Sequence, residues 1–555
     1  MIFIKPLIVK SRIFKKKFGK LVLLTLVIIL VTLCYFFLEL NQLLTKKSTT
    51  ISYKQKLDQE IGIPLQKKLN LIHKVHNPKR LKIGYKYFDE IFNHIFEAKP
   101  KVTELNSYLD QKFQSERYDL KTEGNMFSES YLNKFLQISA NDLVSMKQSH
   151  KYIIDNLPND YPKNLYNGNG IVYVGGGQFN WLTLLSIRNL RQLGSKLPVE
   201  VLIPKLDEFE LELCGNILPK LNAKCIYMPY VLPKSIYEKF KFKGYQYKVL
   251  AILLSSFQNV LLLDSDNIPV KNPDNLFVSN PFISKGLIVW PDFWKRSTSP
   301  AYYSIAGLNP SKSEFLPKYN EAEGKYLPQD LPKSLDLDHI PLHERKFTIP
   351  DPTSESGQLM ISKKSHMKPL LLSLYYNIYG PNHYYPLFLQ GASGEGDKET
   401  FLAATIVTNN QFYQVGQFLN AFGHFDSKNE FVGTGMGQFD PVQDYLHSTK
   451  DGDPPEIMFV HANFPKLNPW GLKLDNKIVD ENGNRVRIYG TGMAKRVGFD
   501  FELVQWQNSK YLLCDLNIKL ATFEHVNHKD MCEELSTHID FLNSTQSTLE
   551  GEFER

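Results

Sequence analysis

The chain has little cysteine and no broad excess of charge. Only five cysteines occur in 555 residues, and their spacing fits no zinc-binding pattern. The formal net charge is +7, but the first 20 residues contain seven lysines and arginines and no acid. The rest of the chain therefore carries 58 basic and 58 acidic side chains. A neutral body argues against a broad phosphate-binding surface, so we expect no nucleic-acid partner.

Other patterns are also missing. The sequence contains no G-x-G-x-x-G fingerprint, no internal repeat and no low-complexity tract. The first absence argues against a dinucleotide-binding domain. Hydrophobic residues make up 43% of the chain and charged residues 22%, which predicts a packed globular body rather than disorder.

The N-terminal region has the pattern of a membrane anchor. The segment "LVLLTLVIILVTLCYFFL", residues 21–38, follows the basic residues 1–20 and has no charge. A helix of this length spans about 27 Å, and a basic N-terminal flank predicts a cytosolic N-terminus. A cleaved signal peptide is the alternative. We expect a cytosolic tail (1–20), a transmembrane signal-anchor (21–38), a stem (39–130), a lumenal domain (131–545) and a C-terminal tail (546–555).

A lumenal location makes disulfides plausible. Cys34 lies in the expected membrane segment, which leaves an even number of cysteines in an oxidising compartment. Proximity favours the pairs Cys214–Cys225 and Cys514–Cys532 among three connectivities, and four buried free thiols are the alternative. One glycosylation sequon is present, at Asn543.

Strands and helices alternate from about residue 165. "GIVYVGGG", "PVEVLIP", "AKCIYMPY" and "NVLLLDSD" have the pattern of strands, and "WLTLLSIRNLRQL", "FELELCGNILPKL" and "GYQYKVLAILLSSF" that of intervening helices. This alternation predicts an α/β domain with a parallel sheet and helices on both faces. Ligands of such sheets bind beyond the carboxyl ends of the strands. Gly175–Gly177 and the acids Asp264 and Asp266 should therefore share one crevice.

The acid pair Asp264 and Asp266 ends a strand that has the pattern of a buried one. Two uncompensated carboxylates would be costly there, and a divalent cation such as Mn²⁺ or Mg²⁺ is the natural remedy. The cation would in turn hold an anionic group such as a diphosphate. A structural acidic turn is the alternative. Two other Asp-x-Asp triplets have the pattern of solvated loops: Asp336/Asp338 and Asp451/Asp453.

Several segments resemble a known family. "LLLDSDNIPVKNPDNLF" resembles the metal-binding segment of nucleotide-sugar-dependent transferases with the GT-A fold, a Rossmann-like α/β domain. "YVGGGQFNWLTLLSIRNLR", "SGQLMIS", "GEGDKETF" and "FVHANFPKLNPW" resemble the fungal Golgi α-mannosyltransferases, glycosyltransferase family 71. The resemblance is closest to the α-1,2-mannosyltransferase branch and runs from about residue 130 to 542.

The resemblance implies a single-pass type II Golgi membrane protein with a lumenal catalytic domain. Such an enzyme transfers mannose from GDP-mannose to mannan or N-glycan acceptors of cell-wall glycoproteins, with Mn²⁺ and retention of configuration. The resemblance to Golgi transferases also suggests that the protein forms a complex with other transferases. The residues themselves support a metal and a diphosphate but do not identify mannose.

The resemblance also assigns residues. His461 would be the third metal ligand beside Asp264 and Asp266, and Lys466 would contact the diphosphate; a satisfied buried histidine is the alternative. Asp264 could contact the ribose of the sugar donor instead. Tyr247 and Lys248 resemble positions that contact the sugar donor, although they could also begin a solvated helix.

Other candidates come from the residues alone. Gly175, Gly176 and Gly177 would let the backbone approach the nucleotide, or form a plain tight turn. Asp397 and Glu399, in "GASGEGDKETF", are candidates for the carboxylate beneath the reacting sugar, and Glu355 is a weaker one. Asp397 could also cap a helix. The aromatic segment 375–388 could stack on sugars or pack in the core, and the insert 308–352 could be an acceptor loop.

Three rival functions share features with this sequence. A haloacid-dehalogenase-type phosphotransferase also has Asp-x-Asp after a strand, but it needs Thr or Val where Ile268 stands. An α-1,3-mannosyltransferase or another hexosyltransferase of the same fold is an alternative within the enzyme class. A non-catalytic lumenal carbohydrate-binding protein is the alternative outside it.

Overall fold

A computed structural model describes most of the chain. The described ranges are 65–119, 125–320, 323–329, 336–392, 394–450 and 454–546. The expected cytosolic tail, signal-anchor, first part of the stem and nearly all of the C-terminal tail lie outside them. Among the helices within these ranges, none combines the length and apolarity that a membrane crossing requires.

The chain divides into two units, Met1–Leu71 and Ile72–Arg555. The second begins well before residue 131, where we expected the stem to end. Its first long helix, α2 (Pro78–Glu97), is capped by the side chain of Asn77 and buries Phe88, Ile91 and Ile95. An apolar face at helical spacing has to be covered, so this part of the expected stem packs as part of the compact unit. Described residues 72–119 and 125–130 of the expected stem thus belong to the same unit as the expected lumenal domain.

The expected helical segment 131–157 is present. It contains the end of α3 (Glu129–Leu132) and all of α4 (Ala140–Asn156). Ser139 caps α4 by accepting a hydrogen bond from the amide of Asp142, and the helix buries Met146 and Ile153.

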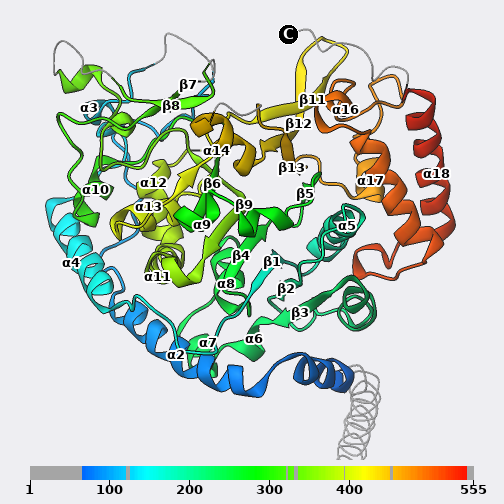
Figure 1. Ribbon diagram of the computed structural model, residues 1–555, viewed down its shortest axis with the longest axis horizontal. Helices are drawn as coiled ribbons and strands as arrows, with labels where there is room; N and C mark the ends of the chain where they lie inside the picture. Colours follow the sequence, from blue (N-terminus) through cyan, green and yellow to red (C-terminus); the bar gives the residue numbers. More distant parts are fainter. Residues whose placement is uncertain are drawn as a thin grey trace, which may run out of the picture. The chain divides into compact units, whose positions relative to one another are not determined.

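A seven-stranded sheet forms the centre of the second unit (Figure 1). Its order is β10-β6-β9-β4-β1-β2-β3, and β4, β1, β2 and β3 run parallel as predicted. β9 lies antiparallel between β4 and β6. The strands are β1 (Asn169–Val174), β2 (Val199–Ile203), β3 (Ala223–Tyr227), β4 (Asn259–Leu263), β6 (Leu287–Pro291), β9 (Ser354–Ser362) and β10 (Tyr413–Gln414).

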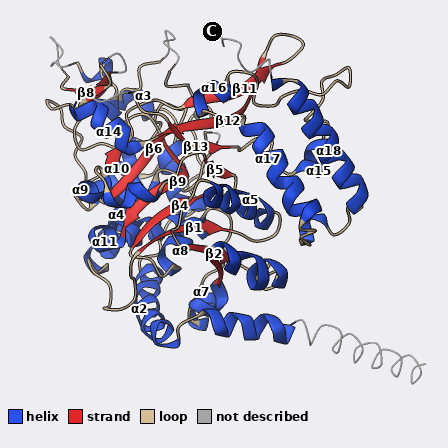
Figure 2. Cartoon of the chain, turned by 45° about the vertical axis from the view of Figure 1, so that its right-hand side comes forward, coloured by secondary structure: helices blue, strands red, loops and turns tan. Residues whose placement is uncertain are grey.

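Helices lie on both sides of this sheet (Figure 2). α8 (Gln246–Leu254) packs against α11 (Lys363–Ile378), whereas α5 (Phe179–Gln192) packs against α17 (Phe501–Lys510). The α/β class predicted from the sequence is confirmed. Further helices are α6 (Met228–Val231), α7 (Lys234–Lys239), α9 (Phe282–Lys285), α10 (Pro300–Ala306), α12 (Tyr385–Leu389), α13 (Thr400–Val407), α14 (Pro441–Lys450), α15 (Pro469–Leu474), α16 (Met493–Val497) and α18 (His528–Ser544).

A second sheet is antiparallel and has the order β11-β12-β13-β5. Its strands are β11 (Asn420–Phe425), β12 (Phe431–Phe439), β13 (Ile457–His461) and β5 (Asn267–Pro269). β5 directly follows the acid pair, and the register sets His461 opposite Asn267. A separate hairpin joins β7 (Lys318–Asn320) to β8 (Lys325–Leu327).

Both predicted disulfides are confirmed. Cys214 is bonded to Cys225, and Cys514 to Cys532. The expected helix over 209–221 is shorter than predicted: after a first turn the chain forms a π-turn (Leu213–Ile217) and a 3₁₀ turn (Leu218–Leu221), and Pro219 ends the regular pattern.

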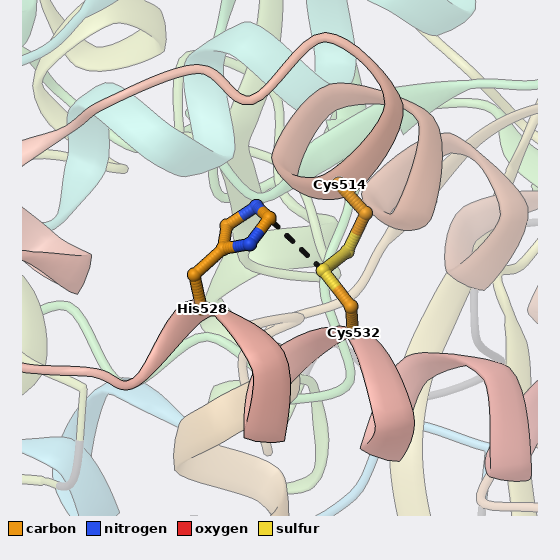
Figure 3. Close-up of side chains that lie close together, drawn as sticks. All are labelled: Cys514, His528 and Cys532. Atoms are coloured by element: carbon orange, nitrogen blue, oxygen red, sulfur yellow. Dashed lines mark hydrogen bonds between the residues drawn. A yellow bond between two sulfur atoms is a disulfide. The ribbon is translucent and has the colours of Figure 1, made fainter.

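The second disulfide lies beside His528 (Figure 3). The histidine Nε2 is 3.7 Å from Cys532 Sγ, and the three side chains have the residue types of a metal site. Both sulfurs are consumed in the disulfide, so this cluster offers no thiolate ligand. It anchors the start of α18 instead.

The aromatic segment 375–388 belongs to the core. Tyr375, Tyr376 and Tyr384 are fully buried and contact one another edge to face or tilted. The packing interpretation is therefore confirmed, and these rings are not available to stack on a sugar.

Candidate active site

The acid pair and one histidine meet at the end of β4. The ligand atoms of Asp264, Asp266 and His461 all lie within 4.8 Å of one another. His461 Nε2 is 3.3 Å from Asp266 Oδ1, and both side chains are about nine-tenths buried or more. The grouping predicted from the sequence is thus present in the structure.

Two backbone features produce this meeting. The amide of Asn267 donates to the carbonyl of Asp264 at 3.0 Å, which closes a tight turn around the acid pair. The amide of Ala462 donates to the carbonyl of Asp266 at 2.9 Å, so β13 is fixed beside the turn. His461 therefore points at the acids because β13 pairs with β5, about 200 residues away in sequence.

Each acid has its own lysine. Lys248 Nζ lies 2.8 Å from Asp264 Oδ2, and Lys466 Nζ contacts Asp266 Oδ2. Burial raises the pKa of Asp264, although Lys248 opposes that shift. Burial would also raise the pKa of Asp266, but His461 and Lys466 outweigh it and hold this pKa well below its usual range. The two buried acids therefore favour positively charged groups beside them.

The residues fit a divalent cation. Two carboxylates and an imidazole form a donor set that suits Mn²⁺, and carboxylates also suit Mg²⁺. Burial alone would lower the pKa of His461, yet Asp266 and Glu355 raise it to about 10. Lys248, Lys466 and a protonated His461 thus supply the positive charge that the acids require. A divalent cation bound by the same acids would neutralise their charge instead. His461 would then bind the cation as a neutral imidazole.

Glu355 completes the environment of the histidine. Its Oε1 lies 3.6 Å from His461 Nδ1, and its pKa is lowered to about 2 because His461 and Lys248 outweigh the effect of burial. Gly357 is needed beside it, since a Cβ there would be 2.7 Å from His461 Nδ1. The glycine in "SESGQ" is the sequence signal that could have indicated this close approach.

Asp397 reaches the same cluster from another loop. It is 2% exposed, its Oδ1 accepts a hydrogen bond from Ser356 Oγ at 3.3 Å, and it lies 3.8 Å from Lys248 Nζ. Lys248 therefore lies between Asp264 and Asp397. Burial raises the pKa of Asp397 to about 6. The side chain does not cap α13, whose N-cap residue is Glu399.

Glu399, the other candidate catalytic acid, has a different partner. It forms a fully buried ion pair with Arg296 and accepts a hydrogen bond from the amide of Ser354 at 3.2 Å. A carboxylate engaged in this way holds the loop in place. Of the two acids singled out in "GEGDKETF", the structure brings only Asp397 to the Lys248 cluster.

The glycine turn lies at the same edge of the sheet. Ser265 Oγ donates to the carbonyl of Val174 at 2.6 Å, which joins the end of β1 to the acid turn. Gly176 and Gly177 have φ of +103° and +54°, so the turn itself requires glycine. A Cβ on Gly177 would meet nothing within 4 Å, so the backbone there is open to a ligand.

The other residues predicted from the sequence form other contacts or lie elsewhere in the chain. Tyr247 is half-buried, and its hydroxyl donates to the carbonyl of Phe242 at 2.8 Å. The neighbouring Lys248, in contrast, contacts Asp264. Asp336 caps a short 3₁₀ turn, as a solvated loop would predict. Asp451 and Asp453 lie outside the described residues. Asn543 is exposed near the end of α18.

Known proteins resemble the chain over most of its length. Residues 168–440 match a family model described as "Mannosyltransferase putative". The Candida albicans α-1,2-mannosyltransferase MNN21 is 54% identical, over 87% of this chain and 78% of that protein. The Saccharomyces cerevisiae α-1,2-mannosyltransferase MNN2 is 35% identical, over 96% of this chain and 98% of that protein.

Solved structures also align with part of the chain. A galactosyltransferase, LgtC, in complex with sugar donor and acceptor analogues is 12% identical, with a TM-score of 0.25 over 45% of this chain and 73% of that chain. The glycosyltransferase GlyE of Streptococcus pneumoniae is also 12% identical, with a TM-score of 0.24 over 45% of each chain.

Proposed function

Because the chain belongs to the mannosyltransferase family that includes the fungal α-1,2-mannosyltransferases, we propose that it transfers mannose from GDP-mannose in α-1,2 linkage. The acceptors are mannan side chains of N-linked cell-wall glycoproteins. A glycosyltransferase requires a sugar donor and a glycan acceptor. The named relatives support mannose and the α-1,2 linkage, whereas GDP-mannose and the mannan acceptor follow from the resemblance of the motifs to the fungal Golgi α-mannosyltransferases. The observation that carries the proposal is the convergence of Asp264, Asp266 and His461 at the carboxyl end of β4.

The three ligands would hold Mn²⁺ or Mg²⁺, which when bound neutralises charge on a diphosphate. Lys466 supplies further positive charge from a side chain that is 37% exposed. When the sugar–phosphate bond breaks, negative charge grows on the departing GDP, and positive charge at this position lowers the barrier. Electrostatic stabilisation of this kind typically contributes the largest part of such catalysis.

Asp397 is our candidate for the carboxylate beneath the reacting sugar. It shares Lys248 with Asp264, so it borders the acid cluster without belonging to the ligand set. An ionised carboxylate there stabilises an oxocarbenium-like centre. Ser356 and Lys248 fix its orientation. With an α-linked sugar donor and an α-linked product, the reaction retains configuration.

We place the enzyme in the Golgi membrane as a single-pass type II protein. Two disulfides and an exposed sequon at Asn543 suit a lumenal domain. The uncharged run at 21–38 and its basic flank support an anchor with a cytosolic N-terminus.

A screen of sugar donors tests the proposal. Full-length protein in detergent is incubated with a mannose acceptor, Mn²⁺ and one of several nucleotide sugars, and the linkage of the product is determined. We expect transfer from GDP-mannose only and an α-1,2 bond. An α-1,3 product would correct the linkage. Absence of both transfer and hydrolysis with every nucleotide sugar would leave a carbohydrate-binding protein.

A further inference from the structure

A hollow lies where β6 ends and just before β9 begins. It has a volume of about 440 Å³, within the range of small-ligand pockets. The β7–β8 hairpin, β10 and the segment before β9 contribute to its wall. Seven tyrosine and phenylalanine side chains line it: Tyr118, Tyr319, Tyr326, Phe412, Tyr413, Phe418 and Tyr445.

The hollow lies near the active-site edge of the sheet. Pro291 and Pro352 both line it. Pro352 precedes Glu355 by three residues, and three residues span at most about 11 Å. Glu355 in turn lies 3.6 Å from His461. One wall of the hollow is thus within roughly one or two sugar lengths of the acid cluster.

On the other side, Pro291 is followed by Asp292, which pairs with Lys398 at 2.6 Å. Lys398 directly follows Asp397 in sequence. The chain therefore leads from the hollow to both carboxylates that border the candidate site, Glu355 and Asp397. A ligand that extends away from the reacting sugar toward the hollow would follow this edge of the sheet.

The lysines and acids that line the hollow balance in number, since Lys285 and Lys318 stand against Glu344 and Asp351. Lys318 Nζ lies 2.8 Å from Glu344 Oε1, and Lys285 Nζ donates to Gln411 Oε1 at 3.1 Å. Asp351 Oδ1 accepts a hydrogen bond from the amide of Arg296 at 2.7 Å. A phosphate-bearing ligand would therefore meet as many acids as lysines on this wall. A neutral ligand suits this wall better.

The aromatic rings favour a ligand with flat apolar faces. The hydroxyl of Tyr326 donates to the carbonyl of Gln414 at 3.0 Å, and that of Tyr413 donates to Asp444 Oδ2 at 2.7 Å. Since these hydroxyls are engaged with protein atoms, the rings offer mainly their faces and edges. Amphipathic ligands use such surfaces, and a pyranose ring has an apolar face and a polar rim.

We propose that this hollow, the aromatic subsite, binds sugar units of a neutral oligosaccharide acceptor behind the unit that receives mannose. The inference rests on the proposed function, because it assumes that the acid cluster transfers a sugar. It also explains the insert at 308–352, whose β7–β8 hairpin and residues 350–352 help to line the hollow.

Tyr326→Ala tests the aromatic subsite, with Tyr326→Phe and Tyr152→Ala as matched controls. Tyr326 is 37% exposed and Tyr152, on α4 outside the hollow, is 38% exposed. The quantity compared is the ratio of kcat/KM for mannotriose to that for methyl α-mannoside, with GDP-mannose and Mn²⁺ present. Mannotriose affinity is also measured by calorimetry without a sugar donor.

We expect Tyr326→Ala to lower the kcat/KM ratio and the mannotriose affinity about tenfold, the usual effect of removing one aromatic anchor. The Tyr326→Phe and Tyr152→Ala variants should resemble wild type in both measurements. An unchanged ratio in a wild-type-like, active Tyr326→Ala enzyme would overturn the subsite. If the wild type transfers nothing, the proposed function fails. Calorimetry still decides the subsite, which is overturned if mannotriose does not bind or binds both proteins equally.

Discussion

Glu355 Oε1 lies 3.6 Å from His461 Nδ1, on the side of the imidazole away from Asp266. The histidine is thereby held between two acids, one of which belongs to the predicted ligand set. Such a carboxylate behind a metal-binding histidine orients the ring and strengthens it as a ligand. The contacts of this site and the C-terminal disulfide lead to four predictions.

Asp266→Asn should lower transfer by at least about 100-fold, because a metal ligand and its charge are lost while the shape is kept. Mn²⁺ should raise the melting temperature of the wild type and no longer raise that of the variant. The control is Asp338→Asn, the second acid of an exposed Asp-x-Asp triplet. Near-normal turnover of Asp266→Asn would refute the metal assignment.

Gly357→Ala should impair metal binding although it replaces no metal ligand. The added Cβ would lie 2.7 Å from His461 Nδ1 and 3.0 Å from Glu355 Oε1, so the imidazole has to move. We expect the Mn²⁺ concentration for half-maximal activity to rise about tenfold. Gly471→Ala is the control, since its nearest contact would be an ordinary 3.5 Å. An unchanged titration would show that His461 does not bind the metal.

Asp397 should make stability depend on pH. Its pKa is raised to about 6 in the folded protein from 3.8, so the folded state binds the extra proton between these values. Stability from this group is present below pH 4 and is lost as the pH rises through 6. Relative to Asp397→Asn, the wild type should lose up to about 3 kcal/mol between pH 4 and 7.

Urea unfolding of wild type and Asp397→Asn at a series of pH values measures this difference. The same variant should lose most of its transfer activity at pH 7 if the carboxylate stabilises the reacting sugar. If the stability difference between wild type and variant does not vary with pH, the folded protein does not raise the pKa of Asp397.

The Cys514–Cys532 disulfide should stabilise the C-terminal helices. It closes a loop with a sequence separation of 18 and joins the π-turn after α17 (Tyr511–Asp515) to α18. Replacing both cysteines with serine should lower the free energy of unfolding by about 3 kcal/mol. Thermal unfolding checks this value, with the wild type in reducing agent for comparison. A variant as stable as wild type would mean that α18 is held by packing alone.

The sequence predicted the parallel strands and the acid pair well, because both signals are local. It did not predict that α2 packs into the compact unit, because the partners of its apolar face lie elsewhere in the chain. From the sequence, Asp397 and Glu399 were equal candidates for the carboxylate beneath the reacting sugar. Only the structure separates them: Glu399 meets Arg296, whereas Asp397 meets Lys248.

What the sequence determined by itself is the alternation of strands and helices and the presence of two acids at the end of a buried strand. Periodicities of two and 3.6 residues and a charged strand end are properties of neighbouring residues. The tertiary structure decided which cation and which acid each side chain faces. The registers of β13 on β5 and of β9 on β4 bring together residues as many as 200 positions apart, and neighbouring residues do not encode such distances.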